Sequence, residues 1–261
     1  MTAQSDIPMI SVSGLHKRFG ANRVLQGIDL EVARGESLAI IGGSGTGKSV
    51  TLKCILGLLE ADSGSIKIEG REMIGLSSTE REPSLAKLGM LFQGAALFDS
   101  MTVWQNVAFG LIQARNMPPA LAREKAIEAM SKVGLGAELA DMNPAELSGG
   151  MQKRVGLARA IAPEPEILFF DEPTTGLDPI MSGIINELIV DRVHDLGATA
   201  LTITHDMKSA RRIASRIAML YQGKVVWCGP VSEISDSGNP YVDQFIHGNA
   251  DGPIDLDLLR A

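Results

Sequence analysis

A glycine-rich segment between an apolar run and a helix-forming stretch constrains this chain most. Residues 37–41 (SLAII) have the composition of a strand buried on both faces, and a helix is expected at about residues 48–57. Between them, residues 42–49 (GGSGTGKS) fit the pattern G-x-x-x-x-G-K-S. Glycines let consecutive N–H groups curl around one anion, and the positive end of the following helix favours a polyphosphate.

This segment predicts ATP or GTP binding, and its strand and helix context disfavours the alternative of a flexible glycine turn. Lys48 is expected to reach the β and γ phosphates, and the Ser49 hydroxyl is expected to bind Mg²⁺. The predicted nucleotide-binding residues of the segment are Gly42, Gly43, Ser44, Gly45, Thr46, Gly47, Lys48, Ser49 and Val50.

Charge and composition exclude several other classes of protein. A net charge of -7 argues against nucleic acid as a partner, because such proteins usually carry a basic face. No apolar run is long enough to cross a bilayer, and residues 1–8 are too polar for a signal peptide, so membrane association is expected only through another protein. Cys54 and Cys228 match no metal-ligand spacing and are expected to be reduced core residues.

Strand and helix patterns alternate along the chain, which predicts an α/β fold with a mostly parallel sheet. Residues 9–13 and 24–32 alternate like an antiparallel hairpin, whereas residues 102–161 have a helical texture. Glycines and prolines in residues 235–261 suggest an extension outside the core. The expected parts are a core of residues 8–93 and 163–234, a helical insertion of residues 94–162, and the extension of residues 235–261.

Two carboxylates follow a second buried strand. Residues 167–170 (ILFF) deliver Asp171 and Glu172 to its end, which is the Walker B pattern. Asp171 is expected to hold Mg²⁺ through its shell, and Glu172 to orient or deprotonate the attacking water. A solvated acid pair is the alternative, and the glycine-rich segment elsewhere in the chain makes that alternative improbable.

Residues 147–154 (LSGGMQKR) are identified as the signature sequence of ABC ATPases, and the chain resembles their nucleotide-binding domain over nearly its full length. Ser148 is placed to cap a helix, and Gly149 and Gly150 allow close backbone approach to a phosphate. The resemblance implies a P-loop NTPase core with an antiparallel N-terminal β subdomain and an all-helical insertion. It also implies a homodimer in which each signature closes over the partner's ATP, because the chain carries one copy of each motif.

Four further residues match family motifs, and their roles are what the resemblance implies. Gln93 (LFQ) matches the glutamine that senses Mg²⁺ and the lytic water and couples the site to the membrane subunit. His205 (TITHD) matches the switch histidine, and Asp178 (TTGLD) matches the D-loop that crosses to the opposite site. Phe19 (HKRFG) matches the aromatic that stacks on adenine, although an isolated phenylalanine could equally be a core residue. Every catalytic position carries the residue that the family motif requires, so both ATP sites of the homodimer are expected to hydrolyse ATP.

Three local stretches resemble the ATPase of the Mla phospholipid transport system. They are GAALFDSMTV at residues 94–103, KSV at residues 48–50 and QFIHGNADGPI at residues 244–254. This resemblance implies an MlaE-type permease, an MlaD-type lipid-binding protein and an MlaB-type STAS protein as partners, at the cytoplasmic face of the inner membrane. An ATPase of a polar-solute importer of amino-acid type, or a regulatory ATPase of FtsE type, remains an alternative.

Overall fold

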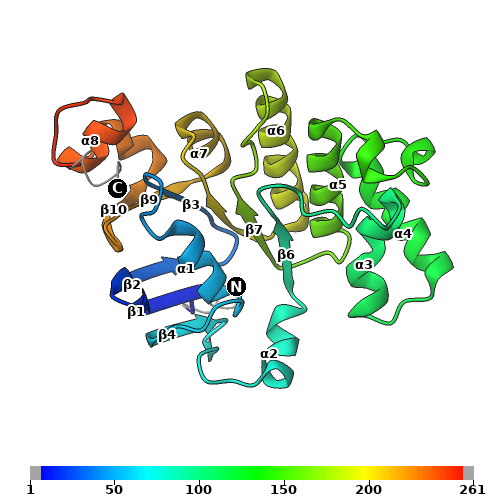
Figure 1. Cartoon of the computed structure of the whole chain (residues 1–261), viewed down its shortest axis with the longest axis horizontal. Coiled ribbons are helices and arrows are strands. Elements are labelled where there is room, and N and C mark those ends of the chain that lie inside the picture. Colours follow the sequence, from blue (N-terminus) through cyan, green and yellow to red (C-terminus); the bar gives the residue numbers. More distant parts are fainter. Residues whose placement is uncertain (1–6, 255–261) are drawn as a thin grey trace, which may run out of the picture. The chain divides into compact units, whose positions relative to one another are not determined.

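The computed structural model describes residues 7–254. Within these residues the chain divides into two compact units, one of residues 7–82 with 202–254 and one of residues 83–201. Within the described residues no helix has the length and apolar character needed to span a bilayer. The strands and helices are labelled in Figure 1, and each unit is described by itself.

The first unit contains a four-stranded antiparallel sheet in the order β2-β1-β4-β5. Ile10 pairs with Val32 on one side and with Ile68 on the other, and all three side chains are buried. The hairpin predicted for residues 9–32 is therefore confirmed. The strands are β1 (Ile10–Phe19), β2 (Asn22–Val32), β4 (Ser63–Ile68) and β5 (Arg71–Glu72).

The first unit also contains a parallel pair of strands, and one of them is the apolar run at residues 37–41, as expected for a strand that is buried on both faces. Strand β3 (Ser37–Ile41) pairs in parallel with β9 (Arg216–Tyr221), and β10 (Lys224–Pro230) pairs antiparallel to β9. Ile40, Ile41 and Ala218 are fully buried there. The helices α1 (Lys48–Ile55) and α7 (Met207–Ile213) complete this part of the unit.

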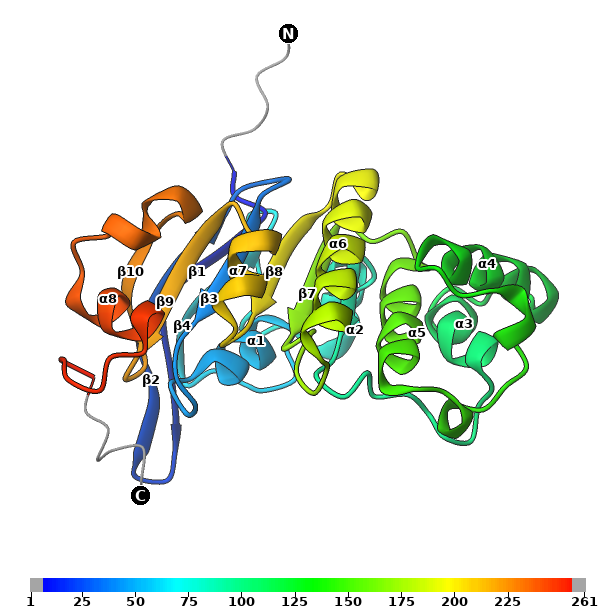
Figure 2. The ribbon, with the colours of Figure 1, turned by 90° about the horizontal axis from the view of Figure 1, so that it is seen from above.

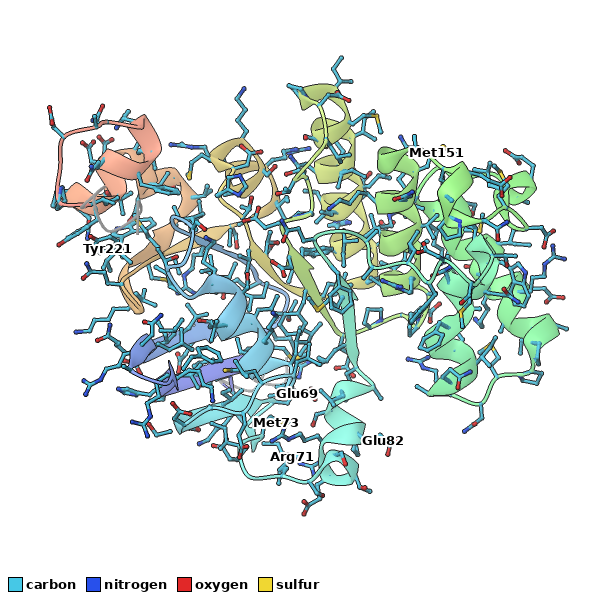
Figure 3. All side chains as sticks on the ribbon, viewed as in Figure 1. Glu69, Arg71, Met73, Glu82, Met151 and Tyr221 are labelled. Atoms are coloured by element: carbon cyan, nitrogen blue, oxygen red, sulfur yellow. The ribbon has the colours of Figure 1, made fainter. Side chains whose placement is uncertain are left out.

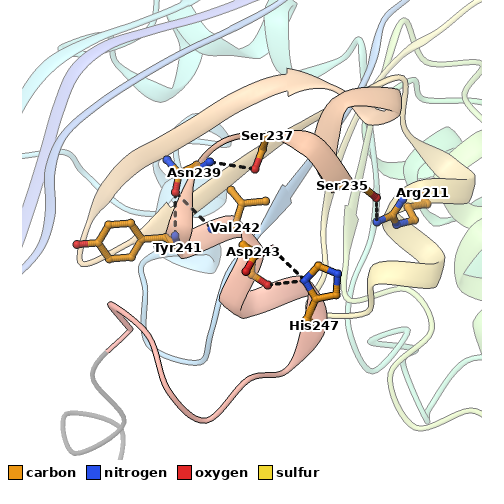
Figure 4. Close-up of polar contacts among 8 residues, drawn as sticks. All are labelled: Arg211, Ser235, Ser237, Asn239, Tyr241, Val242, Asp243 and His247. Atoms are coloured by element: carbon orange, nitrogen blue, oxygen red, sulfur yellow. Dashed lines mark hydrogen bonds and ion pairs between the residues drawn. The ribbon is translucent and has the colours of Figure 1, made fainter.

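Part of the C-terminal segment packs on the core of the first unit, so its predicted place outside the core is wrong for Val242 and Gln244, which are buried, whereas most of residues 235–254 are exposed or half-buried. A 3-10 turn, η3 (Val231–Asp236), leads to helix α8 (Pro240–His247), whose N-cap Asn239 accepts hydrogen bonds from two backbone N–H groups (Figure 4). Val242 is fully buried in a cluster with Ile41 and Ile217. Figure 2 shows α8 beside the strands β9 and β10, where these apolar contacts form.

Val242→Ala is expected to lower the free energy of unfolding by about 2 kcal/mol, because a fully buried side chain loses its contacts and leaves a cavity. Asp243→Ala on the exposed side of the same helix is the control, with an expected cost below about 1 kcal/mol. Urea unfolding followed by circular dichroism measures both. Equal effects of the two substitutions would show that α8 does not pack on the core.

The second unit pairs two parallel strands and carries the helical region. Leu91 of β6 lies opposite Phe170 of β7, so both strands end at the same edge. Gly134 follows the C-cap Val133 of the helix at residues 119–132 and adopts a left-handed backbone (φ 72), which glycine takes without strain. The elements of this unit are β6 (Leu88–Leu91), β7 (Ile167–Asp171), α3 (Val103–Gln113), α4 (Pro119–Lys132), η1 (Ala137–Leu139), η2 (Pro144–Glu146), α5 (Gly149–Ile161) and α6 (Pro179–Leu196). Two further elements, α2 (Ser78–Leu85) and β8 (Thr199–Ile203), cross the boundaries between the units.

The two cysteines differ in their surroundings. Cys54 is buried, and burial raises the pKa of its thiol to about 11. Cys228 is exposed, and its Sγ accepts a hydrogen bond from Arg216 Nη2 at 3.2 Å. Both thiols are free, as expected, but the core placement predicted for Cys228 is wrong, because β10 presents that side chain to solvent.

Candidate functional site

The glycine-rich loop joins β3 to α1 in a conformation that only glycine fits. Gly42 has φ 148, and a Cβ there would stand 2.3 Å from the carbonyl oxygen of Leu220. Gly47 has φ 106, and a Cβ there would stand 2.7 Å from Leu25 Cδ2. The first turn of α1 contains no acidic residue to compete with a bound anion. The loop is therefore a preformed backbone cradle at the positive end of a helix.

Lys48 lies across this cradle. Its Nζ donates to the carbonyl oxygens of Gly42 and Gly43, each at 2.7 Å, and the side chain is only 8% exposed. Thr46 Oγ1 donates to the Gly43 carbonyl at 3.0 Å. Gly43 and Val50 are half-buried, whereas Ser44, Gly45 and Ser49 are exposed. A fixed positive charge within a backbone cradle fits the phosphate groups of a nucleotide.

His205 and Phe19 are the two other predicted site residues of the first unit. His205 is exposed between buried Thr204, whose N–H donates to the Ile40 carbonyl, and Asp206, which caps α7. Phe19 ends β1 and is 50% exposed, so it is not the core residue that its isolated position allowed. An exposed aromatic face is available for stacking on a base.

In the second unit, Gln93 and Glu172 follow the aligned ends of β6 and β7. Glu172 is 9% exposed, has a left-handed backbone (φ 48) and accepts a hydrogen bond from Thr175 Oγ1 at 3.1 Å. Asp171 is half-buried and ends β7, whereas Gln93 is exposed. Because the strand register places residues 91 and 170 opposite each other, the structure brings Gln93 and Glu172 to one edge of the sheet. The side chains of Asp171 and Gln93 offer oxygen donors, which are the ligands that Mg²⁺ prefers.

The signature sequence forms the N-terminus of helix α5, which is the second helix N-terminus predicted to bind phosphate after that of α1. Ser148 is the N-cap of α5, and its Oγ accepts a hydrogen bond from the Met151 N–H at 3.3 Å; Figure 3 labels Met151 at this end of the helix. Gly149 is exposed and Gly150 is buried. Asp178 caps α6 by accepting from the N–H groups of residues 180 and 181, a local role that the sequence analysis did not predict.

Lys153 is a residue of the second unit to which the sequence analysis gave no role. It lies on α5 within the quoted signature, is only 5% exposed, and donates hydrogen bonds to the backbone carbonyls of Gln93 and Glu172. Burial lowers the pKa of its ammonium group, and the carboxylates of Asp171 and Glu172 oppose that shift. The signal available in the sequence was its place within the signature, on the helix that Ser148 caps.

A glycine cradle between a parallel strand and a helix defines a P-loop nucleotide-binding protein. Residues 25–175 match the ABC transporter family. The chain belongs to this family: it is an ATP-binding subunit of an ABC transporter, with the ATPase domain of such proteins.

Known proteins similar to this chain share most of its length. Protein TRIGALACTOSYLDIACYLGLYCEROL 3, chloroplastic, of Arabidopsis thaliana is 42% identical over 267 residues, covering 96% of this chain and 76% of that protein. The probable ribonucleotide transport ATP-binding protein mkl of Mycobacterium leprae is 39% identical over 247 residues, covering 95% and 71%. The dimeric structure of MJ0796, a bacterial ABC transporter cassette, superposes with a TM-score of 0.80 at 30% identity, covering 85% of this chain and 99% of that one.

Proposed function

We propose that this chain hydrolyses ATP as a homodimer to drive phospholipid transport through an MlaE-type permease at the bacterial inner membrane. The observation that carries the lipid assignment is the segment GAALFDSMTV at residues 94–103, which resembles MlaF-type ATPases and follows Gln93 directly. The similar protein from Arabidopsis bears the name of a glycolipid, which supports a lipid as the cargo.

The local structure of this segment supports a role in docking the permease. Asn106 is fully buried and binds the Phe98 backbone through both N–H and carbonyl, at 2.7 and 3.1 Å. Its Nδ2 also donates to the carbonyls of Met101 and Thr102. Phe98 is thereby held 41% exposed, with its ring 4.7 Å from that of Phe109. An exposed aromatic ring that is held in place in this way suits contact with a helix of a membrane protein.

In the proposed site, residues of the first unit bind the nucleotide. The backbone N–H groups of residues 42–50 and the ammonium of Lys48 hold the phosphates, Phe19 stacks on the adenine, and His205 contacts the γ-phosphate. The hydroxyl of Ser49 would be one ligand for Mg²⁺. When bound, MgATP supplies the phosphoryl group that water attacks.

Residues of the second unit carry out the proton chemistry and close the partner's site. A carboxylate oxygen of Glu172 accepts the proton of the attacking water and Gln93 orients that water, while Asp171 would hold Mg²⁺. The N-terminus of α5, with Ser148, Gly149 and Gly150, contacts the γ-phosphate of the ATP that the partner binds. Asp178 reaches the same site of the partner. Binding of two nucleotides thus brings two copies together, and hydrolysis separates them.

A polar-solute importer is the second candidate, favoured by the similarity to the mycobacterial protein named for ribonucleotide transport. Its ATPase would use the same residues, so the nucleotide site does not distinguish the two candidates. The difference lies in the membrane partner and in the binding protein that accompanies it.

Purification of the chain with its membrane partners tests the cargo. We expect a polytopic permease, an MlaD-type protein and an MlaB-type protein to copurify, with phospholipid detected by mass spectrometry of the detergent-solubilised complex. ATPase activity of that complex is not expected to be stimulated by added amino acids. A soluble binding protein in place of the lipid-binding one, with stimulation by a polar solute, would establish the importer instead.

A further inference from the structure

Lys153 joins three sequence motifs of the second unit. It lies five residues beyond the N-cap Ser148 of α5 and donates to the Gln93 carbonyl and, at 3.3 Å, to the Glu172 carbonyl. These two acceptors follow β6 and β7, whose register aligns residues 91 and 170. One buried ammonium group thus ties the signature helix to both loops that carry the proposed catalytic side chains.

The two loops need such support, because non-glycine residues in them adopt left-handed backbone angles. Glu172 has φ 48, and Ala95 and Ala96 have φ 59 and 47. Residues of this kind keep such conformations only where surrounding contacts hold them, and they concentrate at functional sites. The carbonyl of Glu172 itself is an acceptor for Lys153.

Helix α5 holds the loop after Gln93 at a second point. Arg159 donates to the carbonyls of Ala95 and Ala96, the latter at 2.7 Å. Gly156 permits the close approach, since a Cβ there would stand 2.8 Å from Leu91 Cδ1 and 3.1 Å from Ala95 Cβ. The loop is therefore fixed to the helix on both sides of the close contact.

Stability gives little reason for a charged side chain at position 153. A buried ammonium loses hydration, and an apolar residue of similar length would avoid that loss. The acceptors of Lys153 are backbone carbonyls of the two residues whose side chains the proposed chemistry uses. This placement favours a role in positioning.

We propose that Lys153 is a positioning residue that holds the backbones of Gln93 and Glu172, so that the amide and the carboxylate keep the geometry required for ATP hydrolysis. The inference rests on the proposed ATP site. Because α5 begins with the signature that closes over the partner's nucleotide, Lys153 also links the site of one nucleotide to that of the other.

Lys153→Met in the full chain removes both hydrogen bonds of the ammonium group and keeps the approximate length of the side chain. We expect kcat for MgATP hydrolysis to fall about 100-fold, since small displacements of catalytic groups have effects of this size, while KM and the Kd for ATP change less than about threefold. Lys153→Arg keeps a positively charged group that can donate to both carbonyls, and it is expected to retain kcat within about fivefold of the unchanged protein. A purely structural lysine would alter the melting temperature without this split between kcat and KM.

Lys132→Met, on the exposed surface of α4, is the matched control and should leave all constants unchanged. Normal kcat in folded Lys153→Met, or an equal loss in Lys153→Arg, would overturn the positioning role. Should the methionine variant fail to fold, Lys153→Gln, which keeps a shorter amide donor, is measured instead. The same comparison of kcat with KM then decides. Failure of the unchanged chain to bind or hydrolyse ATP would instead refute the proposed function.

Discussion

Glu172→Gln is expected to lower steady-state phosphate release at saturating MgATP at least about 100-fold, while the Kd for ATP changes less than about threefold. General-base catalysis contributes about 100- to 10,000-fold, and an amide cannot take the proton of the attacking water. Glutamine keeps an oxygen that can accept from Thr175 Oγ1, so the local structure should persist. A phosphate-release assay and an ATP titration on the same preparation measure both quantities.

The control for this substitution is Glu124→Gln on the exposed face of α4, which removes an equal charge away from the proposed site. It should hydrolyse ATP within about twofold of the unchanged chain. Turnover by Glu172→Gln at half the normal rate or more would remove Glu172 from the role of general base.

Lys48→Ala is expected to weaken ATP binding about 100-fold, which corresponds to about 2.7 kcal/mol. The substitution removes the ammonium group of Lys48, which donates hydrogen bonds to the carbonyl oxygens of Gly42 and Gly43 in the loop. Charge-assisted hydrogen bonds to phosphate oxygens are among the stronger polar contacts in proteins. Isothermal titration calorimetry with ATP and with ADP would show the loss for both nucleotides.

Lys53→Ala provides the comparison, because Lys53 is exposed on the same helix in its last turn. Its ATP affinity should equal that of the unchanged chain. Undiminished ATP binding by a folded Lys48→Ala variant would mean that the glycine-rich loop does not grip the phosphates.

Two strands could be predicted from the sequence because their residues form short unbroken apolar runs, which are typical of strands buried on both faces. Residues 37–41 and 167–170 are both strands with fully buried centres. The glycine-rich loop was equally predictable, since left-handed and crowded backbone positions at Gly42 and Gly47 demand that residue. Local sequence determines such features.

Features that depend on distant partners could not be predicted in this way. Helix α8 has Asn239 as its N-cap and Pro240 in its first turn, which are usable signals, but its burial depends on Ile41 and Ile217, far away in sequence. Lys153 binds carbonyls 60 and 19 residues away, so no local pattern could give its role.

Sedimentation velocity of the Glu172→Gln chain tests the central claim, that two copies grip each ATP between a glycine-rich loop and a signature helix. With saturating MgATP the chain should sediment as a dimer, and with MgADP or without nucleotide as a monomer. A monomer under all three conditions, with ATP shown to be bound, would contradict the shared site.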